Sequence, residues 1–379
     1  MDYATKRTWA EINLSNLAHN YRSLRGMLPR GCRFLGVVKA NAYGHGAVQV
    51  AKKLEQLGAD YLAVACIDEG IELRREGIEL PVLILGPTPS AFVQELVEYR
   101  FTQTVPDYEY AVEISKEISA LGGQLNIHIK ADTGMSRLGF LCDEEHMDET
   151  IQQIYQTCTL PGLKAEGIFT HFANADGDEE YSMRQLTRFF EVLDKLKCRG
   201  VEFEIRHCAA SAAMLNYPCA HLDMVRPGIS LYGHYPDPSC CDLDGPGLLP
   251  VMTLKTRVIS VRQLEKGTCI SYGCTHTLQR DSKVAVLPLG YADGFERLLS
   301  NRGEVLIRDR RVPIIGRVCM DMCMVDVTDL EDVRVGEEVI VFGCELPLEE
   351  KAEAVGTIQY ELLCGISPRV PRVYLNELV

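Results

Sequence analysis

The sequence predicts an α/β protein in which an N-terminal (β/α)8 barrel of TIM type is followed by a mostly β C-terminal domain. Three observations support this prediction. From about residue 32 to residue 233, short β-rich runs alternate with segments of helical periodicity. A segment rich in Pro, Gly and Asp then follows at residues 234–250, and such a composition is typical of a linker. Beyond it, helical periodicity almost vanishes, and 379 residues are enough for two domains.

The expected barrel strands are about eight short runs rich in β-branched and apolar residues. Parallel strands need helical crossovers, and eight such units close most naturally into a barrel. An open doubly wound sheet is the alternative, but it usually has about five or six strands, and no G-x-G-x-x-G follows the first run. The runs are residues 34–38, 61–66, 81–85, 101–105, 125–131, 163–169, 203–207 and a short run near Met224.

Helical segments separate these runs. The segment after the first run has an apolar face of Ala47, Val50, Leu54 and Leu57. The segment between the sixth and seventh runs carries apolar residues at the same helical spacing, namely Met183, Leu186, Phe189, Phe190, Leu193 and Leu196. Both patterns predict amphipathic helices that cover the barrel.

The N-terminal residues 8–14 resemble a strand, and we expect Ser15 to cap a helix over residues 17–28. The predicted domains are residues 10–240 for the barrel and residues 241–379 for the β domain. The strand at about residues 1–13 could join the β domain. Strands are expected in the runs 254–264, 283–289, 304–318 and 337–343, and Val318, Met320, Met322 and Met324 alternate as on one face of a strand.

Charge and composition exclude several classes of protein. The 39 basic and 53 acidic side chains give a net charge of −14, which argues against nucleic-acid binding but permits a local basic pocket for an anion. We find no signal peptide, and no apolar run reaches the ~18 residues of a membrane span. The fifteen cysteines contain no C-x-x-C, so we expect no metal site and no disulfide framework, and predict buried thiols in a reducing cytoplasm.

Polar residues stand where five of the expected barrel strands end, and in such barrels these positions converge on one mouth. Lys39 alone could be a surface lysine, but at a barrel mouth it could also form a Schiff base. Five polar strand ends in one barrel are hard to explain by packing. The other candidates are Lys130, Arg137, His171, His207, Ser211, Arg226 and Gly228.

Ser211 and the pair Gly228–Ile229 are candidates for binding a phosphate. Ser211 opens a short helix, and the pair offers backbone N–H groups beside a glycine, which suits a phosphate dianion. Alternatively, Ser211 is a simple helix N-cap.

Nine sequence blocks resemble those of the bacterial alanine racemases, which are fold-type III pyridoxal-phosphate enzymes. VVKANAYGHG, which contains Lys39, is similar to the cofactor-lysine motif of that family. The resemblance covers essentially the whole chain and implies a barrel followed by a β domain, in a head-to-tail homodimer with shared active sites. The other blocks follow in the family's order: KADTGMSRLG, THFANAD, MVRPGISLYG, ISYGCTH, LGYADGFER, GRVCMDM, TIQYE and RVPR.

The resemblance implies roles for the cofactor-binding residues. Lys39 would bind pyridoxal 5′-phosphate covalently and act as one of two acid–base groups. Arg226 would face the pyridine nitrogen, which stays unprotonated because a guanidinium only donates. His171 would lie near the ring, and Arg137 would bind the phenolic oxygen. Lys130 would be a candidate for carbamylation, and the phosphate would be held by Tyr43, Ser211, Gly228 and Ile229.

The second acid–base group would be Tyr272 of the partner subunit, because racemisation requires proton transfer on both faces of the substrate. Arg137 would also steer the substrate carboxylate, and Met320 from the β domain of the partner subunit would offer it a backbone N–H. Without the resemblance, Tyr272 could be a half-buried strand tyrosine and Met320 strand core. Tyr360 would narrow the entrance, and the outer entrance would be lined by Arg297 and Arg317.

The implied activity is the interconversion of L-alanine and D-alanine, which would supply D-alanine for peptidoglycan. A serine/alanine racemase is the alternative, although Tyr360 is retained and its loss accompanies serine racemisation in relatives. A non-catalytic pyridoxal-phosphate carrier would be a single domain. A decarboxylase would show a glycine-rich phosphate loop and a C-terminal cysteine motif, which we do not find. One departure is Ala210, where the family often has Asn, so we expect no side-chain hydrogen bond from this position.

Overall fold

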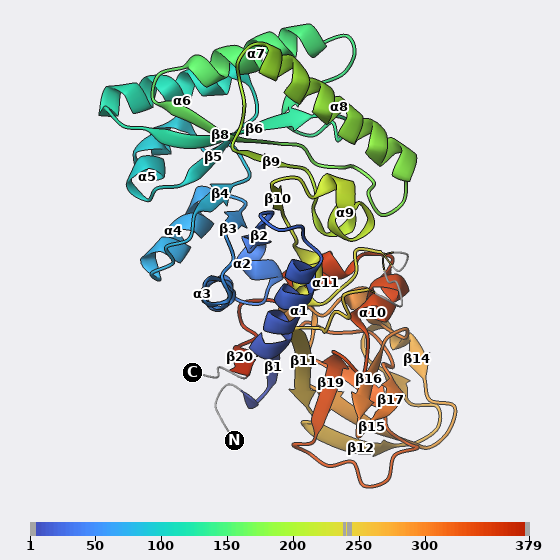
Figure 1. The fold of residues 1–379 in the computed structure, drawn as a ribbon. Coiled ribbons are helices and arrows are strands. Elements are labelled where there is room, and N and C mark those ends of the chain that lie inside the picture. The colour runs from blue at the N-terminus through green and yellow to red at the C-terminus, as the bar shows by residue number, and fades with distance from the viewer. Residues whose placement is uncertain (1–4, 238–239, 241–244, 376–379) are drawn as a thin grey trace. The chain divides into compact units, whose positions relative to one another are not determined.

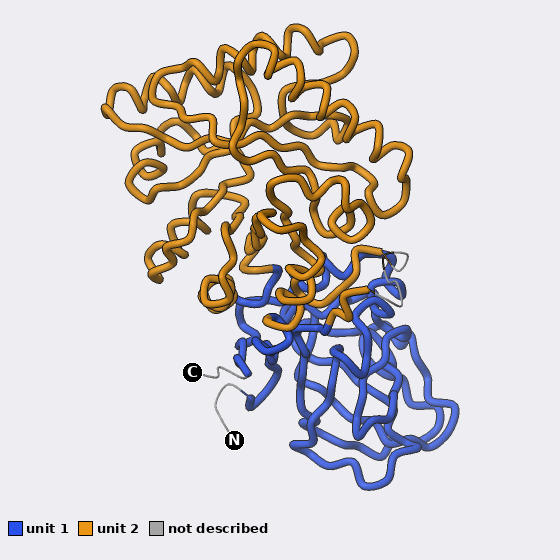
Figure 2. The backbone as a smooth tube through the Cα atoms, in the orientation of Figure 1, with its two compact units in different colours: residues 1–17, 43–46, 249–379 blue, residues 18–42, 47–248 orange. Residues whose placement is uncertain are grey.

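The computed structural model describes residues 5–237, 240 and 245–375. The chain divides into two compact units, which Figure 2 colours separately. Residues 18–42 and 47–248 form the barrel unit, and residues 1–17, 43–46 and 249–379 form the β unit. The expected boundary between residues 240 and 241 adjoins residues 241–244, which lie outside the described residues.

Within the described part of the barrel unit, eight parallel strands follow one another around a nearly closed barrel (Figure 1). Between β9 and β10, Ala210 bridges to Arg226, whose backbone N–H donates to the Ala209 carbonyl at 2.9 Å. The predicted (β/α)8 barrel is confirmed. In spatial order the strands are β10 (Met224–Val225), β2 (Arg33–Val37), β3 (Tyr61–Val64), β4 (Val82–Ile84), β5 (Thr102–Val105), β6 (Leu125–Asp132), β8 (Leu163–Phe169) and β9 (Ile205–His207), with β7 (Phe140–Leu141) beside β6.

Amphipathic helices cover the strands, and α6, α7 and α8 lie side by side in Figure 1. Helix α3 buries Ala47, Val50 and Leu54 as predicted. Helix α8 buries Leu186 and Phe189, whereas Phe190 is exposed. The helices of this unit are α1 (Leu14–Gly26, which begins in the β unit), α2 (Lys39–Tyr43), α3 (Ala47–Leu57), α4 (Ile67–Arg75), α5 (Val93–Glu98), α6 (Tyr108–Leu121), α7 (Met147–Thr159), α8 (Glu179–Cys198) and α9 (Ser211–Asn216).

The described part of the β unit contains three sheets. In the six-stranded sheet, β1 (Thr8–Asn13) pairs antiparallel with β11 (Met252–Arg257) and parallel with β20 (Arg372–Leu375), so residues near both ends of the chain share one sheet. The rest of this sheet is β19 (Glu338–Phe342), β16 (Glu304–Ile307) and β17 (Arg310–Pro313). The smaller sheets are β12 (Ser260–Leu264), β15 (Ser282–Leu287) and β18 (Cys323–Asp326), and β13 (Cys269–Ile270) with β14 (His276–Thr277).

Several expectations for the β unit are wrong in detail. The run 254–264 divides into β11 and β12, which belong to different sheets. The run 304–318 divides where Arg308 and Asp309 adopt positive φ and turn the chain into a hairpin. The alternation from Val318 to Met324 reflects a strand only from Cys323 onwards. Two helices, α10 (Leu348–Val355) and α11 (Gln359–Gly365), are not predicted by the sequence pattern.

The cysteines differ from the expectation of buried filler. All fourteen described cysteines are free thiols, but only five of them are buried and seven are exposed. Cys241 lies outside the described residues. In the part of the chain that the structure describes, we find no helix with the length and apolar character of a membrane span.

The start of α1 corrects the predicted cap. The helix begins at Leu14, and the Asn13 side-chain oxygen accepts hydrogen bonds from the N–H groups of Ser15 (3.0 Å) and Asn16 (3.1 Å). Asn13 is therefore the cap, and Ser15 already lies inside the helix, where its hydroxyl has no capping role.

Replacing Asn13 with Ala should lower the free energy of unfolding by about 1 kcal/mol, because two helix N–H groups lose their acceptor. The matched variant Ser15→Ala should change it by less than ~0.5 kcal/mol. Urea unfolding followed by circular dichroism measures both. A larger loss for Ser15→Ala would contradict the assignment of the cap.

Candidate active site

The carboxyl ends of the barrel strands bring together most of the predicted cofactor residues. His171 follows β8, and its imidazole is buried. Its pKa is lowered well below the ordinary value by burial first and then by four cationic side chains. These cations are Arg226, Lys130, Arg137 and Lys39, in decreasing order of effect. All five side chains belong to the barrel unit, which therefore gathers four cationic groups near one buried imidazole.

Arg226 is the deepest of these cations, and only 4% of its surface is exposed. Its Nη1 lies 2.9 Å from His207 Nδ1, and its Nη2 donates to the carbonyls of Thr170 (2.9 Å) and Cys208 (3.1 Å). The guanidinium carbon lies 5.3 Å from the centre of the Phe169 ring. Burial lowers the pKa of Arg226 to about 10, so it stays charged at neutral pH. Among the described residues, its Nε–H has no acceptor and is available to a ligand.

A chain of buried hydrogen bonds continues from Arg226 across the barrel interior. His207 Nε2 lies 2.9 Å from His128 Nδ1, and His128 Nε2 lies 3.4 Å from Glu166 Oε2. Because a guanidinium only donates, His207 Nδ1 must accept, so its Nε2 carries the proton and donates to His128. By the same argument His128 donates from Nε2 to Glu166. Every proton in the chain therefore points from Arg226 towards the carboxylate.

The surroundings of this chain keep both imidazoles neutral. Burial lowers the pKa of His128 and of His207, and for His207 the charge of Arg226 adds to the effect. Burial alone would raise the pKa of Glu166, but hydrogen bonds from His128 and Tyr61 outweigh it and the pKa is lowered. A Cβ at residue 167 would lie 2.7 Å from the His128 ring, so only glycine there leaves room for it.

Ser211 holds two backbone N–H groups rather than capping a helix. It is the first residue of α9, and its Oγ accepts from the N–H groups of Gly228 (3.0 Å) and Ser230 (3.3 Å). The simple N-cap interpretation is therefore wrong. The nearby Ser230 Oγ is buried and has no hydrogen-bond partner among the described residues. This combination of a hydroxyl, an unpaired hydroxyl and glycine-flanked backbone suits a phosphate.

Lys39 is positioned by an unusual turn. Ala40, Asn41, Ala42 and Tyr43 all have φ of 52° to 53°, the left-handed region that non-glycine residues adopt only at a cost of roughly 1–2 kcal/mol each. The Ala40 N–H donates to Glu69 (2.7 Å), and the Asn41 side chain accepts from the Ala47 N–H (2.8 Å). Strain of this kind is typical of functional sites.

Lys130 is a buried amine whose Nζ has no hydrogen-bond partner among the described residues. It lies 4.7 Å from the centre of the Phe169 ring. Burial and then the charge of Arg226 lower its pKa to about 7. A fraction of the amine is therefore neutral and nucleophilic at neutral pH, which is the form that reacts with carbon dioxide.

Arg137 is held by a loop whose organiser the sequence analysis missed. The Asp132 carboxylate at the end of β6 accepts from four consecutive backbone N–H groups, those of residues 134–137, at 2.9 to 3.1 Å. The exposed Arg137 side chain thus extends from an ordered loop. The signal was present in the run KADTG, where an acidic residue ends the strand just before a glycine.

In the β unit, the predicted substrate residues occupy neighbouring loops. Tyr272 is 72% exposed, and Met320 is 53% exposed in a loop, so the strand-tyrosine and strand-core alternatives are both wrong. Ser271, which has a positive φ of 63°, donates from Oγ to the Arg317 carbonyl at 2.7 Å and so joins the loops of Tyr272 and Met320. Arg297 is exposed in a short 3₁₀ turn.

Tyr43 and Tyr360 lie together elsewhere in the β unit. Their ring centres are 6.0 Å apart, and Tyr360 belongs to α11. Tyr43 is buried, and burial raises the pKa of its phenol. The predicted residues thus form two sets, a cationic cluster in the barrel unit and a group of exposed or aromatic side chains in the β unit.

The comparisons with known proteins find alanine racemases, and the matches cover nearly the whole chain. The family model for the N-terminal domain of alanine racemase matches residues 12–236, and that for the C-terminal domain matches residues 251–374. The alanine racemase of Desulforamulus reducens is 47% identical over 97% of this chain and 99% of that protein. Alanine racemase 2 of Caldanaerobacter subterraneus is 45% identical over 97% of this chain and 95% of that protein.

Solved structures give the same result. The alanine racemase of Clostridium difficile 630 superposes with a TM-score of 0.93 at 44% identity, covering 98% of this chain and 97% of that chain. The Bacillus anthracis alanine racemase with bound L-Ala-P has a TM-score of 0.90 at 35% identity, covering 98% of this chain and 96% of that chain.

We predict that His128 and His207 are neutral Nε2–H tautomers and stay neutral in mildly acidic buffer in which an exposed histidine is charged, because burial lowers the pKa of both. The ¹⁵N chemical shifts of histidine-labelled protein report both the charge and the tautomer. Glu166→Gln keeps an acceptor oxygen and should preserve the tautomers. Glu166→Leu should cost about 1–3 kcal/mol of stability. A proton on His207 Nδ1 would contradict the proposed direction of these hydrogen bonds, because it would face the Arg226 donor.

Lys130 should make stability depend on pH. The folded protein releases this proton near pH 7, whereas the unfolded chain keeps it to about pH 10. The unfolded state therefore binds more protons between these values, and wild-type stability should rise with pH across the interval. Lys130→Met should raise the unfolding temperature at pH 7 in buffer free of carbon dioxide, and the gain should vanish towards pH 10. The exposed control Lys116→Met on α6 should show no such trend.

Proposed function

The chain belongs to the alanine racemase family, and on that basis we propose that it interconverts L-alanine and D-alanine with pyridoxal 5′-phosphate as cofactor. The observation that carries the proposal is the buried Arg226. Its Nη1 and Nη2 bond to the protein, whereas its Nε–H has no acceptor among the described residues. A neutral ring nitrogen would be its natural partner.

The residues of the barrel unit fit this cofactor. Lys39 stands at the end of β2, where it would bind the cofactor covalently. Ser211, Gly228 and Ile229 would hold the phosphate with Tyr43, and the unpaired Ser230 hydroxyl lies in the same segment. The cations around His171 would balance the negative charges of the phosphate and the phenolic oxygen. When bound, pyridoxal 5′-phosphate withdraws electrons from the substrate α-carbon and so acidifies its C–H bond.

Two groups would move the proton at the α-carbon. Lys39 would act on one face through its amine, and Tyr272 on the other through its phenolic oxygen. The exposure of Tyr272 supports a role in the active site of a second subunit, in a head-to-tail homodimer with shared sites. Arg226 would limit the reaction to return of the proton, because a guanidinium cannot give up a proton to the ring nitrogen.

The substrate carboxylate would be bound by donors from two subunits, Arg137 of one and Met320 of its partner. Met320 offers a backbone N–H that has no acceptor among the described residues, and Arg137 offers its guanidinium. His171 would lie beside the ring, and Tyr360 would narrow the entrance together with Tyr272. A carbamylated Lys130 would carry a negative charge and pair with Arg137. Arg297 and Arg317 would attract carboxylates at the outer entrance of a protein whose net charge is −14.

We further propose that the enzyme works in the cytoplasm and supplies D-alanine for peptidoglycan. Serine is the second candidate substrate, and Tyr360 on α11 favours alanine because it adds bulk beside the proposed phosphate ligand Tyr43. Comparing kcat/KM for the two amino acids decides between them.

Incubation with L-alanine in deuterated buffer tests the function. A racemase must exchange the α-proton and abolish optical rotation without releasing carbon dioxide. A protein that binds the cofactor, with an absorbance band that borohydride bleaches, but exchanges no α-proton would be a carrier, and the proposed activity would be refuted.

Tyr272→Phe should reduce racemisation by about 100-fold or more, since one of two acid–base groups is lost. Because the two enantiomers are equally stable, kcat/KM must fall equally in both directions, so rates alone do not identify the base. The discriminating readout is α-proton exchange without inversion, which Lys39 should still support for one enantiomer. Tyr155→Phe on α7 is the control. Equal, mild losses of exchange for both enantiomers would mean that the base is misassigned.

A further inference from the structure

The loop that carries Met320 is fixed by backbone hydrogen bonds on one side only. Within it, the Cys319 N–H donates to the Met322 carbonyl at 2.9 Å. The Cys319 and Met320 carbonyls accept from the N–H groups of Tyr291 (3.1 Å) and Ala292 (3.0 Å). The Met320 N–H is left without an acceptor among the described residues. The loop is therefore fixed through its carbonyls, whereas the N–H groups of Met320, Asp321 and Met322 have no acceptor among the described residues.

The inner side of this loop rests on the turn Gly290–Asp293. A Cβ at residue 290 would lie 2.3 Å from both the Cys319 and the Met320 carbonyl oxygens, so the approach requires glycine. Its φ of −150° is accessible to any residue, which means that space and not backbone strain is the constraint. The position of Met320 thus depends directly on the position of this turn.

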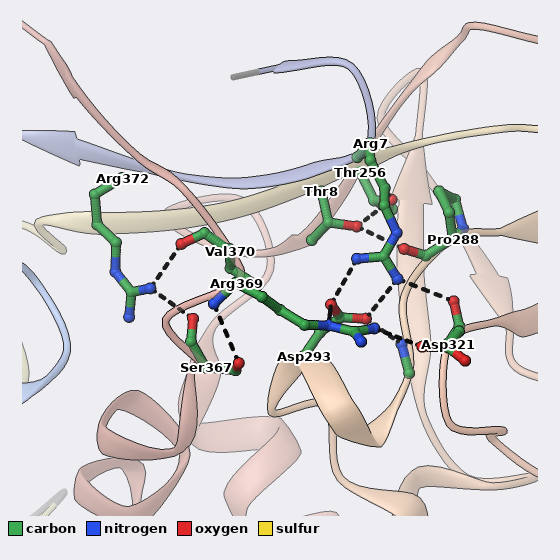
Figure 3. A network of polar contacts seen from close by, with 11 residues as sticks. Arg7, Thr8, Thr256, Pro288, Asp293, Asp321, Ser367, Arg369, Val370 and Arg372 are labelled. Atoms are coloured by element: carbon green, nitrogen blue, oxygen red, sulfur yellow. Dashed lines mark hydrogen bonds and ion pairs between the residues drawn. The ribbon is translucent and has the colours of Figure 1, made fainter. Parts of the chain in front are cut away.

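The turn is anchored by the Asp293 carboxylate, which is fully buried (Figure 3). Its Oδ1 accepts from Arg7 Nη1 (2.6 Å) and Arg369 Nε (2.7 Å). Its Oδ2 accepts from Arg7 Nη2 (3.0 Å) and the Gly290 N–H (2.9 Å). Burial alone would raise the pKa of Asp293, but the hydrogen bonds from the two arginines and Gly290 outweigh it, and the pKa is lowered. The carboxylate is therefore charged and holds four donors.

The same two arginines continue to Asp321, the neighbour of Met320. Arg369 Nη2 lies 2.7 Å from Asp321 Oδ1, and Arg7 Nη2 donates to the Asp321 carbonyl at 3.2 Å. Figure 3 shows both guanidinium groups between the two aspartates. Arg7 precedes β1 and Arg369 precedes β20, and these strands pair with each other. One buried charge thus connects the Met320 loop to strands from both ends of the chain.

We propose that Asp293 is a positioning residue that presents the Met320 N–H to the substrate carboxylate. It acts through the Gly290–Asp293 turn and through Arg7 and Arg369, and it touches neither substrate nor cofactor. The proposal rests on the proposed function, because it assigns the carboxylate of alanine to this N–H. The carboxylate of alanine is unchanged through the reaction. Its contact with the Met320 N–H therefore contributes equally to the ground state and the transition state, and it sets KM rather than kcat.

Asp293→Asn is the sharpest test because it conserves shape. An amide has one acceptor oxygen and an NH₂ group that only donates. In either orientation of the amide, two of the four donors around residue 293 would face NH₂ instead of oxygen. The turn should loosen, and KM for alanine should rise about tenfold while kcat changes by less than about threefold. Cofactor absorbance should be retained, since the cofactor residues lie in the barrel unit and the segment 43–46.

Hydrogen–deuterium exchange of the holoenzyme supplies a readout that needs no activity. The amides of Tyr291 and Ala292 should exchange at least about tenfold faster in Asp293→Asn, while peptides from β15 and β18 keep their protection. The matched control is Glu350→Gln, which disrupts a bidentate pair with Arg311 in the same unit. It should leave KM and the exchange of residues 290–293 unchanged.

Gly290→Ala provides an independent variant, and it decides the matter if Asp293→Asn does not fold. It should displace the Met320 loop by direct contact and raise KM in the same way. An unchanged KM in the folded variants, a fall confined to kcat, or unaltered exchange at residues 291 and 292 would each overturn the positioning role. A wild-type protein that does not racemise alanine would refute the proposed function instead, and the exchange experiment would still report on Asp293.

Discussion

Arg226 places a full positive charge inside the barrel, and the surrounding residues are arranged to make that burial tolerable. Removing an ion from water costs several kcal/mol, and no carboxylate among the described residues lies within ion-pair distance of this guanidinium. Instead, two carbonyls, the His207 ring and the face of Phe169 surround it. The compensating anion, Glu166, is reached only through two imidazoles. The backbone of the same residue contributes to barrel closure, because it bonds to the segment that follows β9.

The strand order and the strand-end candidates could be predicted from the sequence because both depend on local signals. Short runs of β-branched and apolar residues separated by amphipathic segments indicate a barrel, and residues that follow such runs, such as Lys39 and Arg226, must lie at its mouth. His128 and Glu166 escaped prediction because each lies inside a strand, where a polar residue is explained only by a partner on another strand. His128 is paired across the interior with His207, 79 residues away.

The prediction of a strand through Met320 was wrong for a different reason. Alternating apolar residues predict a strand only if the backbone has a neighbouring strand to pair with. Here the chain folds back at Cys319–Met322, and its carbonyls bond to a turn rather than to a strand. The cap of α1 was placed on Ser15 because serine is a favourable cap, but Asn13 is equally favourable and stands one residue before the helix. Sequence alone does not distinguish two good caps so close together.

The charge distribution of the barrel also has a consequence for stability. The charges that most strongly lower the pKa of His171 are all cations, and the Asp132 carboxylate is occupied by four backbone N–H groups. This cationic cluster is therefore electropositive within a chain of net charge −14. An anionic ligand that enters it relieves repulsion among Lys39, Arg137 and Arg226, and a ligand that binds only the folded state stabilises it by mass action. The positive charge that lowers stability here is thus the same property that favours an anionic ligand, as the proposed cofactor and substrate both are.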